Sequence, residues 1–205
     1  MKKTLLAIAC ASALGAQAAT PNLGLDLSGS NPLLAHPNFA ASAADRAAEE
    51  IRKLENGDIL NIRSFGARDN TDNLLNNRFV ISRHNRADAL AKKVAQYIRS
   101  LPERNVQAQD QTNLIAYLEF SELNCDTGGR VLAITDGLES SSELSGYAFK
   151  SMEKGLPAPE VSLAGCHITF YGLGAGWEPR TIRHVRREWQ NWMQEAEADF
   201  VAIIP

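Results

Sequence analysis

Short apolar runs with strand character alternate with amphipathic helical segments, and this alternation restricts the fold more than any other feature. The run Val131–Ile134 is almost continuously apolar, as is typical of a strand buried on both faces. In the segment 39–54, by contrast, apolar residues recur at helical spacing. Because strands that alternate with helices form parallel sheets, we expect an α/β fold: a Rossmann-like, doubly wound, mostly parallel sheet with helices on both faces.

The same periodicities place the individual elements. Strands are expected around 23–25, 58–65, 79–81, 130–134, 167–171 and 200–204. Helices are expected at 39–54, 85–101 (capped by Asn85), 114–123 and from Pro179 onward, with one short helix within the Ser- and Gly-rich segment 138–164. Polar residues around the third strand predict that it pairs with the second as an antiparallel edge hairpin.

The first 18 residues have the pattern of a signal peptide. Lys2 and Lys3 precede the apolar run Leu5–Leu14, and Ala16-Gln17-Ala18 matches an A-x-A cleavage site. Cys10 raises the alternative of a lipoprotein, but Ala7 stands three positions before it where leucine is usual. We therefore expect a mature, periplasmic or secreted domain at 19–205 with no intrinsic membrane anchor, because the apolar run is too short to span a bilayer.

The charge balance and the cysteines restrict the function further. Loss of Lys2 and Lys3 leaves 19 of the 21 basic residues against 24 acidic ones, a net charge of −5, which argues against a nucleic-acid partner. Cys125 and Cys166 remain after cleavage, and an even pair in an oxidising compartment favours a disulfide. Two buried free thiols are the alternative.

Oxygen-bearing side chains occur at three places in the sequence, the first of them directly after the first expected strand. Asp26, Ser28 and Ser30 are spaced two apart, so along an extended strand they would point the same way. Thr112 stands just before the third expected helix, and Asp136 follows the buried strand 130–134. In a doubly wound sheet, ligands bind at the carboxyl ends of the strands, where these residues are expected to meet.

These residues resemble the metal-ion-dependent adhesion site of the von Willebrand factor A domain, which combines D-x-S-x-S with a distant Thr and a distant Asp. The resemblance covers nearly all of the mature chain and implies one Mg²⁺ or Mn²⁺ ion held by the hydroxyls of Ser28, Ser30 and Thr112. Asp26 and Asp136 would act through bound water. The family implies a protein-binding module, not an enzyme, whose partner offers Asp or Glu to the ion. The protein would be either a monomer or part of a larger assembly.

Three further residues are expected at the rim of this site. Asn31 and His36 belong to a lengthened passage between Ser30 and the first helix, and this passage departs from the family's usual pattern. Trp177 follows the strand 167–171 and either anchors a partner or packs over the last helix. The glycines at 172, 174 and 176 lack the G-x-G-x-x-G spacing and are interpreted as a tight turn.

Two other functions remain open at this stage. A metal-assisted phosphoester hydrolase would need a general base, for which His36 is the nearest candidate. A structural domain with a vestigial metal site would need no ion at all.

Overall fold

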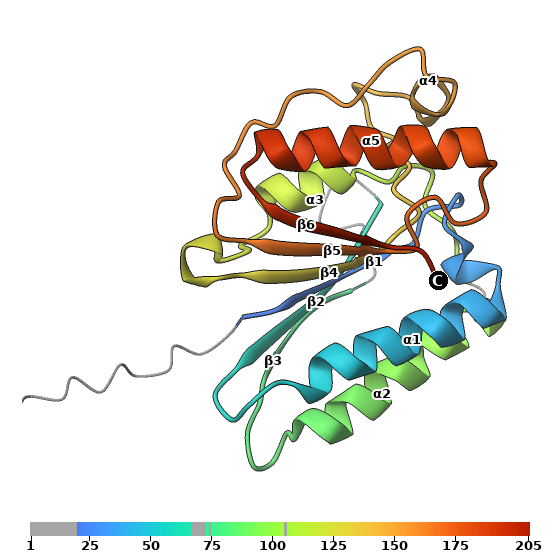
Figure 1. Cartoon of the computed structure of the whole chain (residues 1–205). Helices are drawn as coiled ribbons and strands as arrows, with labels where there is room; N and C mark the ends of the chain where they lie inside the picture. The colour runs from blue at the N-terminus through green and yellow to red at the C-terminus, as the bar shows by residue number, and fades with distance from the viewer. Residues whose placement is uncertain (1–19, 67–72, 74, 105) are drawn as a thin grey trace, which may run out of the picture.

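A six-stranded sheet forms the centre of the protein (Figure 1), seen in a computed structural model that describes residues 20–66, 73, 75–104 and 106–205. The expected signal peptide lies outside the described residues. The strands are β1 (Asn22–Asp26), β2 (Ile59–Phe65), β3 (Asn76–Val80), β4 (Arg130–Ile134), β5 (His167–Tyr171) and β6 (Asp199–Ile203), in the order β3-β2-β1-β4-β5-β6. Only β3 is antiparallel, and it lies at an edge beside β2. The expected fold class and edge hairpin are confirmed.

Helices cover both faces of the sheet (Figure 1). One face carries α1 (Pro37–Arg52) and α2 (Ala87–Ser100), and the other carries α3 (Leu114–Phe120) and α5 (Pro179–Glu195). The short α4 (Gly146–Lys150) lies outside α5. Three single 3₁₀ turns complete the described helices: η1 (Pro32–Leu34), η3 (Leu101–Glu103) and η4 (Cys125–Thr127).

The central strand β4 supplies side chains to both cores. Leu132 and Ile134 pack with α1 and α2, whereas Val131 and Ala133 pack with α3 and α5. This division follows from the alternation of side chains along a strand. It explains why the run is apolar at every position.

Helix α2 begins later than its sequence indicates. Arg86 occupies the N-cap position without a side-chain hydrogen bond to the helix. Asn85, expected to cap this helix, instead donates its side-chain amide to the Val80 carbonyl at 3.0 Å. The prediction for Asn85 was therefore wrong, because the end of β3 offers this amide a partner that only the tertiary structure brings near.

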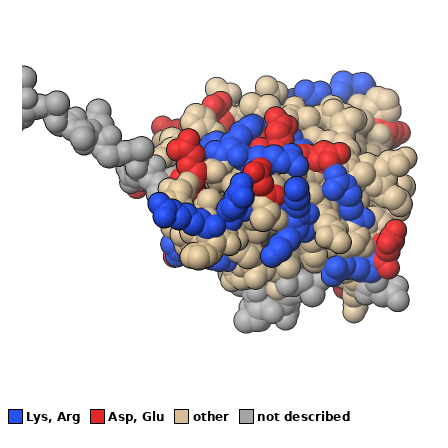
Figure 2. All heavy atoms as spheres, turned by 90° about the horizontal axis from the view of Figure 1, so that it is seen from below, with Lys and Arg blue, Asp and Glu red and all other residues tan. Residues whose placement is uncertain are grey.

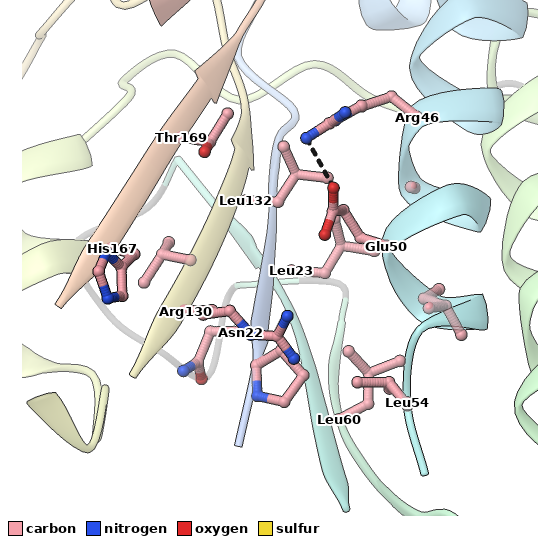
Figure 3. Close-up of a pocket in the computed structure, with 14 residues that line it drawn as sticks. Asn22, Leu23, Arg46, Glu50, Leu54, Leu60, Arg130, Leu132, His167 and Thr169 are labelled. Carbon is pink, nitrogen blue, oxygen red and sulfur yellow. Dashed lines mark ion pairs between the residues drawn. The ribbon is translucent and has the colours of Figure 1, made fainter. Parts of the chain in front are cut away.

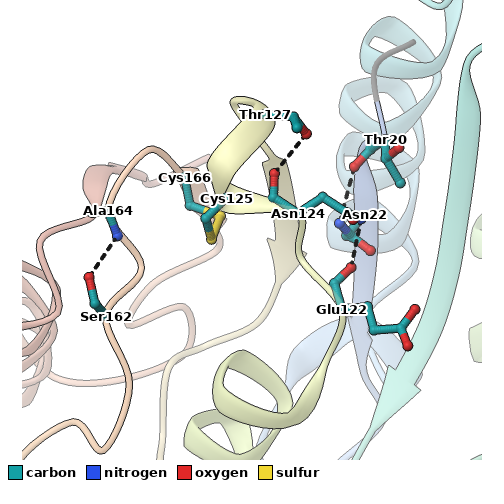
Figure 4. The surroundings of a disulfide bond; sticks show 9 residues. All are labelled: Thr20, Asn22, Glu122, Asn124, Cys125, Thr127, Ser162, Ala164 and Cys166. Carbon is teal, nitrogen blue, oxygen red and sulfur yellow. Dashed lines mark hydrogen bonds between the residues drawn. A yellow bond between two sulfur atoms is a disulfide. The ribbon is translucent and has the colours of Figure 1, made fainter. Parts of the chain in front are cut away.

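The disulfide fastens the amino ends of two neighbouring strands (Figure 4). Cys125, in η4 before β4, is bonded to Cys166, immediately before β5, across 41 positions of sequence. The expected pairing is confirmed, and it lies at the edge of the sheet opposite to the carboxyl ends. In sheets of this type the ligand-binding crevice lies outside the carboxyl ends, at the point where the strand order reverses, which here is between β1 and β4.

Candidate metal centre

Asp26 is the last residue of β1, and its side chain organises the turn that follows. The carboxylate is fully buried, and its Oδ1 accepts a hydrogen bond from the Ser28 backbone N–H at 2.9 Å. The Ser28 and Ser30 hydroxyl oxygens lie 3.1 Å apart. The sequence predicted that these side chains lie together because they alternate along a strand. The strand β1 ends at Asp26, however, and it is a turn folding back on the carboxylate that brings the two hydroxyls together.

The segment after β4 lies directly beside this turn. Thr135 donates its hydroxyl to Asp26 Oδ2 at 2.7 Å and accepts the Gly137 N–H at 2.9 Å. Asp136 Oδ1 accepts the Leu138 N–H at 2.9 Å, and the Ser30 side chain also hydrogen-bonds to the Asp136 carboxylate. Asp26, Ser28, Ser30 and Asp136 therefore form one connected polar cluster at the β1–β4 crevice.

Thr112 is tied to the same edge through backbone hydrogen bonds. The N–H groups of Thr112 and Asn113 both donate to the Ser140 carbonyl, at 3.0 and 3.1 Å. Gln109 exchanges backbone hydrogen bonds with the 27–29 segment, donating to Leu27 and accepting from Gly29. The loop that carries Thr112 is thus fastened both to the Ser28 turn and to the segment after Asp136, with Thr112 only 1% exposed.

Burial makes the ionised forms of the two carboxylates in the cluster unfavourable in free energy. Burial, and after it the charge of Asp136, raises the pKa of Asp26 from 3.8 to about 7. Burial likewise raises the pKa of Asp136, against the hydrogen bonds from Leu138, Ser30 and Trp177 that lower it. Among the residues that the structure describes, neither carboxylate forms an ion pair with a Lys, Arg or His.

This donor set fits a small hard cation. Mg²⁺ and Mn²⁺ prefer oxygen ligands, and three hydroxyls with two carboxylates supply them without nitrogen or sulfur. Within the described ranges, no group of three or more His, Cys, Asp or Glu side chains could hold a metal. Hydroxyl ligation is accordingly central to any metal centre built here, and a divalent cation would offset the repulsion between the buried carboxylates.

The three expected rim residues have different surroundings. Asn31 is only 2% exposed: its amide donates to the Asp26 and Ile134 carbonyls at 2.9 and 3.2 Å. Its side chain joins β1 to β4 beneath the cluster, so the expectation that it contacts a partner is corrected. His36 is exposed immediately before α1 and makes no side-chain capping bond.

Trp177 packs against the core, which is one of the two alternatives that its sequence position left open. Its ring is partly buried and packs against the core under α5, while its indole N–H donates to Asp136 Oδ2 at 3.2 Å. The turn before it requires glycine at 174, where φ is +81° and a Cβ would approach Ile182 Cγ1 to 2.9 Å. Trp177 therefore contacts the candidate metal centre directly.

Two residues at this site were missed by the sequence analysis. Thr135 has the only available signal, a hydroxyl that directly precedes Asp136 at the end of a buried strand. Glu139 has none, yet it is 1% exposed, and its Oε2 accepts the Leu114 and Ile115 N–H groups at the start of α3. Burial raises the pKa of Glu139 to about 7, and its hydrogen bonds link the loops of Asp136 and Thr112.

Other surface features lie away from this edge. A pocket of about 100 Å³ opens between α1 and the sheet, lined by Asn22, Arg130 and His167 at the amino ends of their strands (Figure 3). Figure 2 shows the face formed by α1 and α2, where basic side chains are interspersed with acidic ones. Ion pairs along α1 include Arg46–Glu50 at 2.6 Å. Across the described residues, no helix has the length and apolar character needed to cross a membrane.

Comparisons with known proteins find only remote structural likenesses. No protein-family model and no curated protein matches this sequence. Proximal thread matrix protein 1 from the mussel byssus is 12% identical, with a TM-score of 0.45 over 91% of this chain and 42% of that one. A von Willebrand factor type A structure from Catenulispora acidiphila is 14% identical, with a TM-score of 0.45 over 92% of this chain and 39% of that one. This chain thus spans about two fifths of the length of each.

Proposed function

We propose that this protein is a divalent-metal-dependent protein-binding module that captures an acidic side chain of its partner. The observation that supports this most directly is the pair of buried carboxylates, Asp26 and Asp136, which no described cationic side chain neutralises. A buried charge is costly unless it is paired or coordinates a metal. Both carboxylates lie among hydroxyls at the edge where this type of sheet binds ligands.

Each residue has a distinct part in the proposed site. Ser28, Ser30 and Thr112 would hold one Mg²⁺ or Mn²⁺ ion through their hydroxyls, with Asp26 and Asp136 acting largely through bound water. When bound, the ion supplies a Lewis-acidic position that a partner's carboxylate can complete. Thr135 and Trp177 keep Asp26 and Asp136 in place, as hydrogen-bonding neighbours of metal ligands commonly do.

The proposed setting is a periplasmic, secreted or surface assembly. The Cys125–Cys166 disulfide is compatible with an oxidising compartment. The mature protein would start after residue 18, and its partner would be a protein rather than a nucleic acid. No observation favours hydrolysis: His36, the candidate general base, is exposed, and no hydrogen bond from another described residue orients its ring for proton transfer.

Calorimetric titration with Mg²⁺ and Mn²⁺ tests the site itself. Wild type is expected to bind one ion, and Ser28→Ala is expected to lose most of that affinity while its circular dichroism spectrum is unchanged. An exported fraction passed over the immobilised protein, with and without chelator, then tests partner capture. Absence of metal binding would support a vestigial site instead, and capture that persists in chelator would contradict the metal-dependent mechanism. Phosphoester turnover with Mn²⁺ that is lost in His36→Ala would favour the hydrolase.

A further inference from the structure

An exposed cation lies over the Trp177 ring, beside the candidate metal centre, and is not one of the residues proposed to hold the ion. Lys150, in α4, places its ammonium nitrogen 3.8 Å from the centre of the Trp177 ring. Tyr147, three residues earlier and thus on the same side of α4, is 74% exposed. We call Tyr147, Lys150 and Trp177 the indole platform.

The platform is held in position by the protein core. Phe149 is fully buried and anchors α4, and the Ser145 hydroxyl caps this helix by accepting the Ala148 N–H at 3.2 Å. On the other side, the Trp177 N–H is fixed on Asp136. The Lys150 ammonium is therefore presented at a set distance from the metal centre, with less freedom to lose on binding than a lysine on a mobile loop.

The chemistry of the platform favours an acidic ligand. Lys150 is exposed, and within the part of the chain that the structure describes it pairs with no carboxylate. One side of its ammonium faces the indole ring, and the remaining N–H donors are free for an anion. The Trp177 indole lies between Lys150 Nζ and Asp136 Oδ2, so these two atoms are at most about 9 Å apart. Two to three residues of an extended peptide span this distance.

We propose that the partner presents two acidic side chains that are separated in its sequence by one or two other residues. One acid binds at the metal centre, and the other binds Lys150 on the indole platform. This inference rests on the proposed function for the first acid only. The second acid is recognised by the Lys150 ammonium, which the Trp177 ring holds in place. A single-acid partner and an anion bound without metal are the competing outcomes.

Capped peptides Glu-Gly-Glu, Glu-Gly-Gln and Gln-Gly-Glu, titrated in Mn²⁺, test the proposal. The diacid is expected to bind about 3- to 10-fold more tightly than either monoacid, because it adds one partly exposed ion pair between its second carboxylate and Lys150. Lys150→Gln should abolish this advantage and leave the Mn²⁺ affinity unchanged. Lys154→Gln, which removes an exposed cation four residues along the same segment, should keep it.

The outcomes separate the two proposals. Equal affinities for diacid and monoacid, or an advantage that survives in Lys150→Gln, would overturn the platform while metal binding stands. If the protein binds no Mn²⁺, the proposed function fails, and the peptides are compared without metal. Without the ion the first acid has no site, so binding of a single acid that depends on Lys150 would then show an anion site alone and would overturn the two-acid partner.

Discussion

Trp177 donates its indole N–H to Asp136 Oδ2 at 3.2 Å, which joins the loop after β5 to the residue that follows β4. A second indole supports the same segment, because Trp189 donates to the Gly137 carbonyl at 2.7 Å. Gly137 has φ of +76°, and a Cβ there would meet Leu173 Cδ1 at 2.2 Å. The orientation of Asp136 is therefore set by two tryptophans from the C-terminal quarter of the chain.

Replacing Trp177 by Phe should lower Mn²⁺ affinity about tenfold, because the ring is kept while the hydrogen bond that orients Asp136 is lost. Calorimetry measures the affinity. Trp192→Phe is the matched control, since the Trp192 indole N–H is buried and has no hydrogen-bond partner among the described residues. Equal affinities in wild type and Trp177→Phe would show that the indole does not position the carboxylate.

Asp26→Asn should separate metal binding from folding. The amide oxygen can still accept from the Ser28 N–H, the NH₂ group that replaces Oδ2 can donate to the Thr135 hydroxyl oxygen, and the substitution removes a buried charge beside Asp136. We expect the metal-free variant to be more stable than wild type at pH 8 by about 1–3 kcal/mol, and its melting temperature to be unaffected by Mg²⁺. Thermal unfolding with and without Mg²⁺ checks both effects, with the exposed Asp126→Asn as control. A full Mg²⁺ response in Asp26→Asn would contradict the assignment.

Stability of the metal-free protein should fall as the pH rises. Asp26 and Glu139 have pKa values of about 7 in the folded state, above their ordinary 3.8 and 4.5. Between about pH 4 and 7 the folded state therefore holds protons that the unfolded state has released, so the free energy of unfolding decreases with rising pH. The loss is on the order of 3–4 kcal/mol per carboxyl at most and is complete above about pH 8.

Denaturant unfolding across this pH range measures the effect. Glu139→Gln removes one titrating group and keeps an acceptor for Leu114 and Ile115, so its stability should depend less on pH. Bound Mg²⁺ favours the charged carboxylates and should stabilise wild type more at pH 8 than at pH 5. A metal-free protein that gains stability from pH 5 to 8 would refute the assignment of these protons.

Loss of the disulfide should weaken the fold and spare the metal centre. The bond closes a loop of about 40 residues, worth about 3–4 kcal/mol in the chain-entropy account. Cys125→Ala/Cys166→Ala should lose about that much in free energy of unfolding. Its Mn²⁺ affinity should equal that of wild type, because the bond lies at the amino ends of β4 and β5. A parallel fall in affinity would show that the two ends of the sheet are coupled.

Much of the site could be located from the sequence because its residues follow elements with strong patterns. Asp26 and Asp136 stand at the ends of apolar strands, and a doubly wound topology brings such ends together. Asn31 was misjudged because a polar residue in a Ser–Asn–Pro segment resembles surface. Its burial depends on two carbonyls, of Asp26 and Ile134, that are 108 residues apart in the chain.

The sequence by itself determined the order of strands and helices, the sheet type and the set of oxygen donors, since these depend on local periodicity and residue chemistry. Only the tertiary structure decided which of those donors are buried without a compensating cation, that Trp177 contacts Asp136, and that Lys150 lies over the Trp177 ring. These relations join segments from different strands and loops. Burial and electrostatic environment are properties of such packed neighbours, and no local pattern records them.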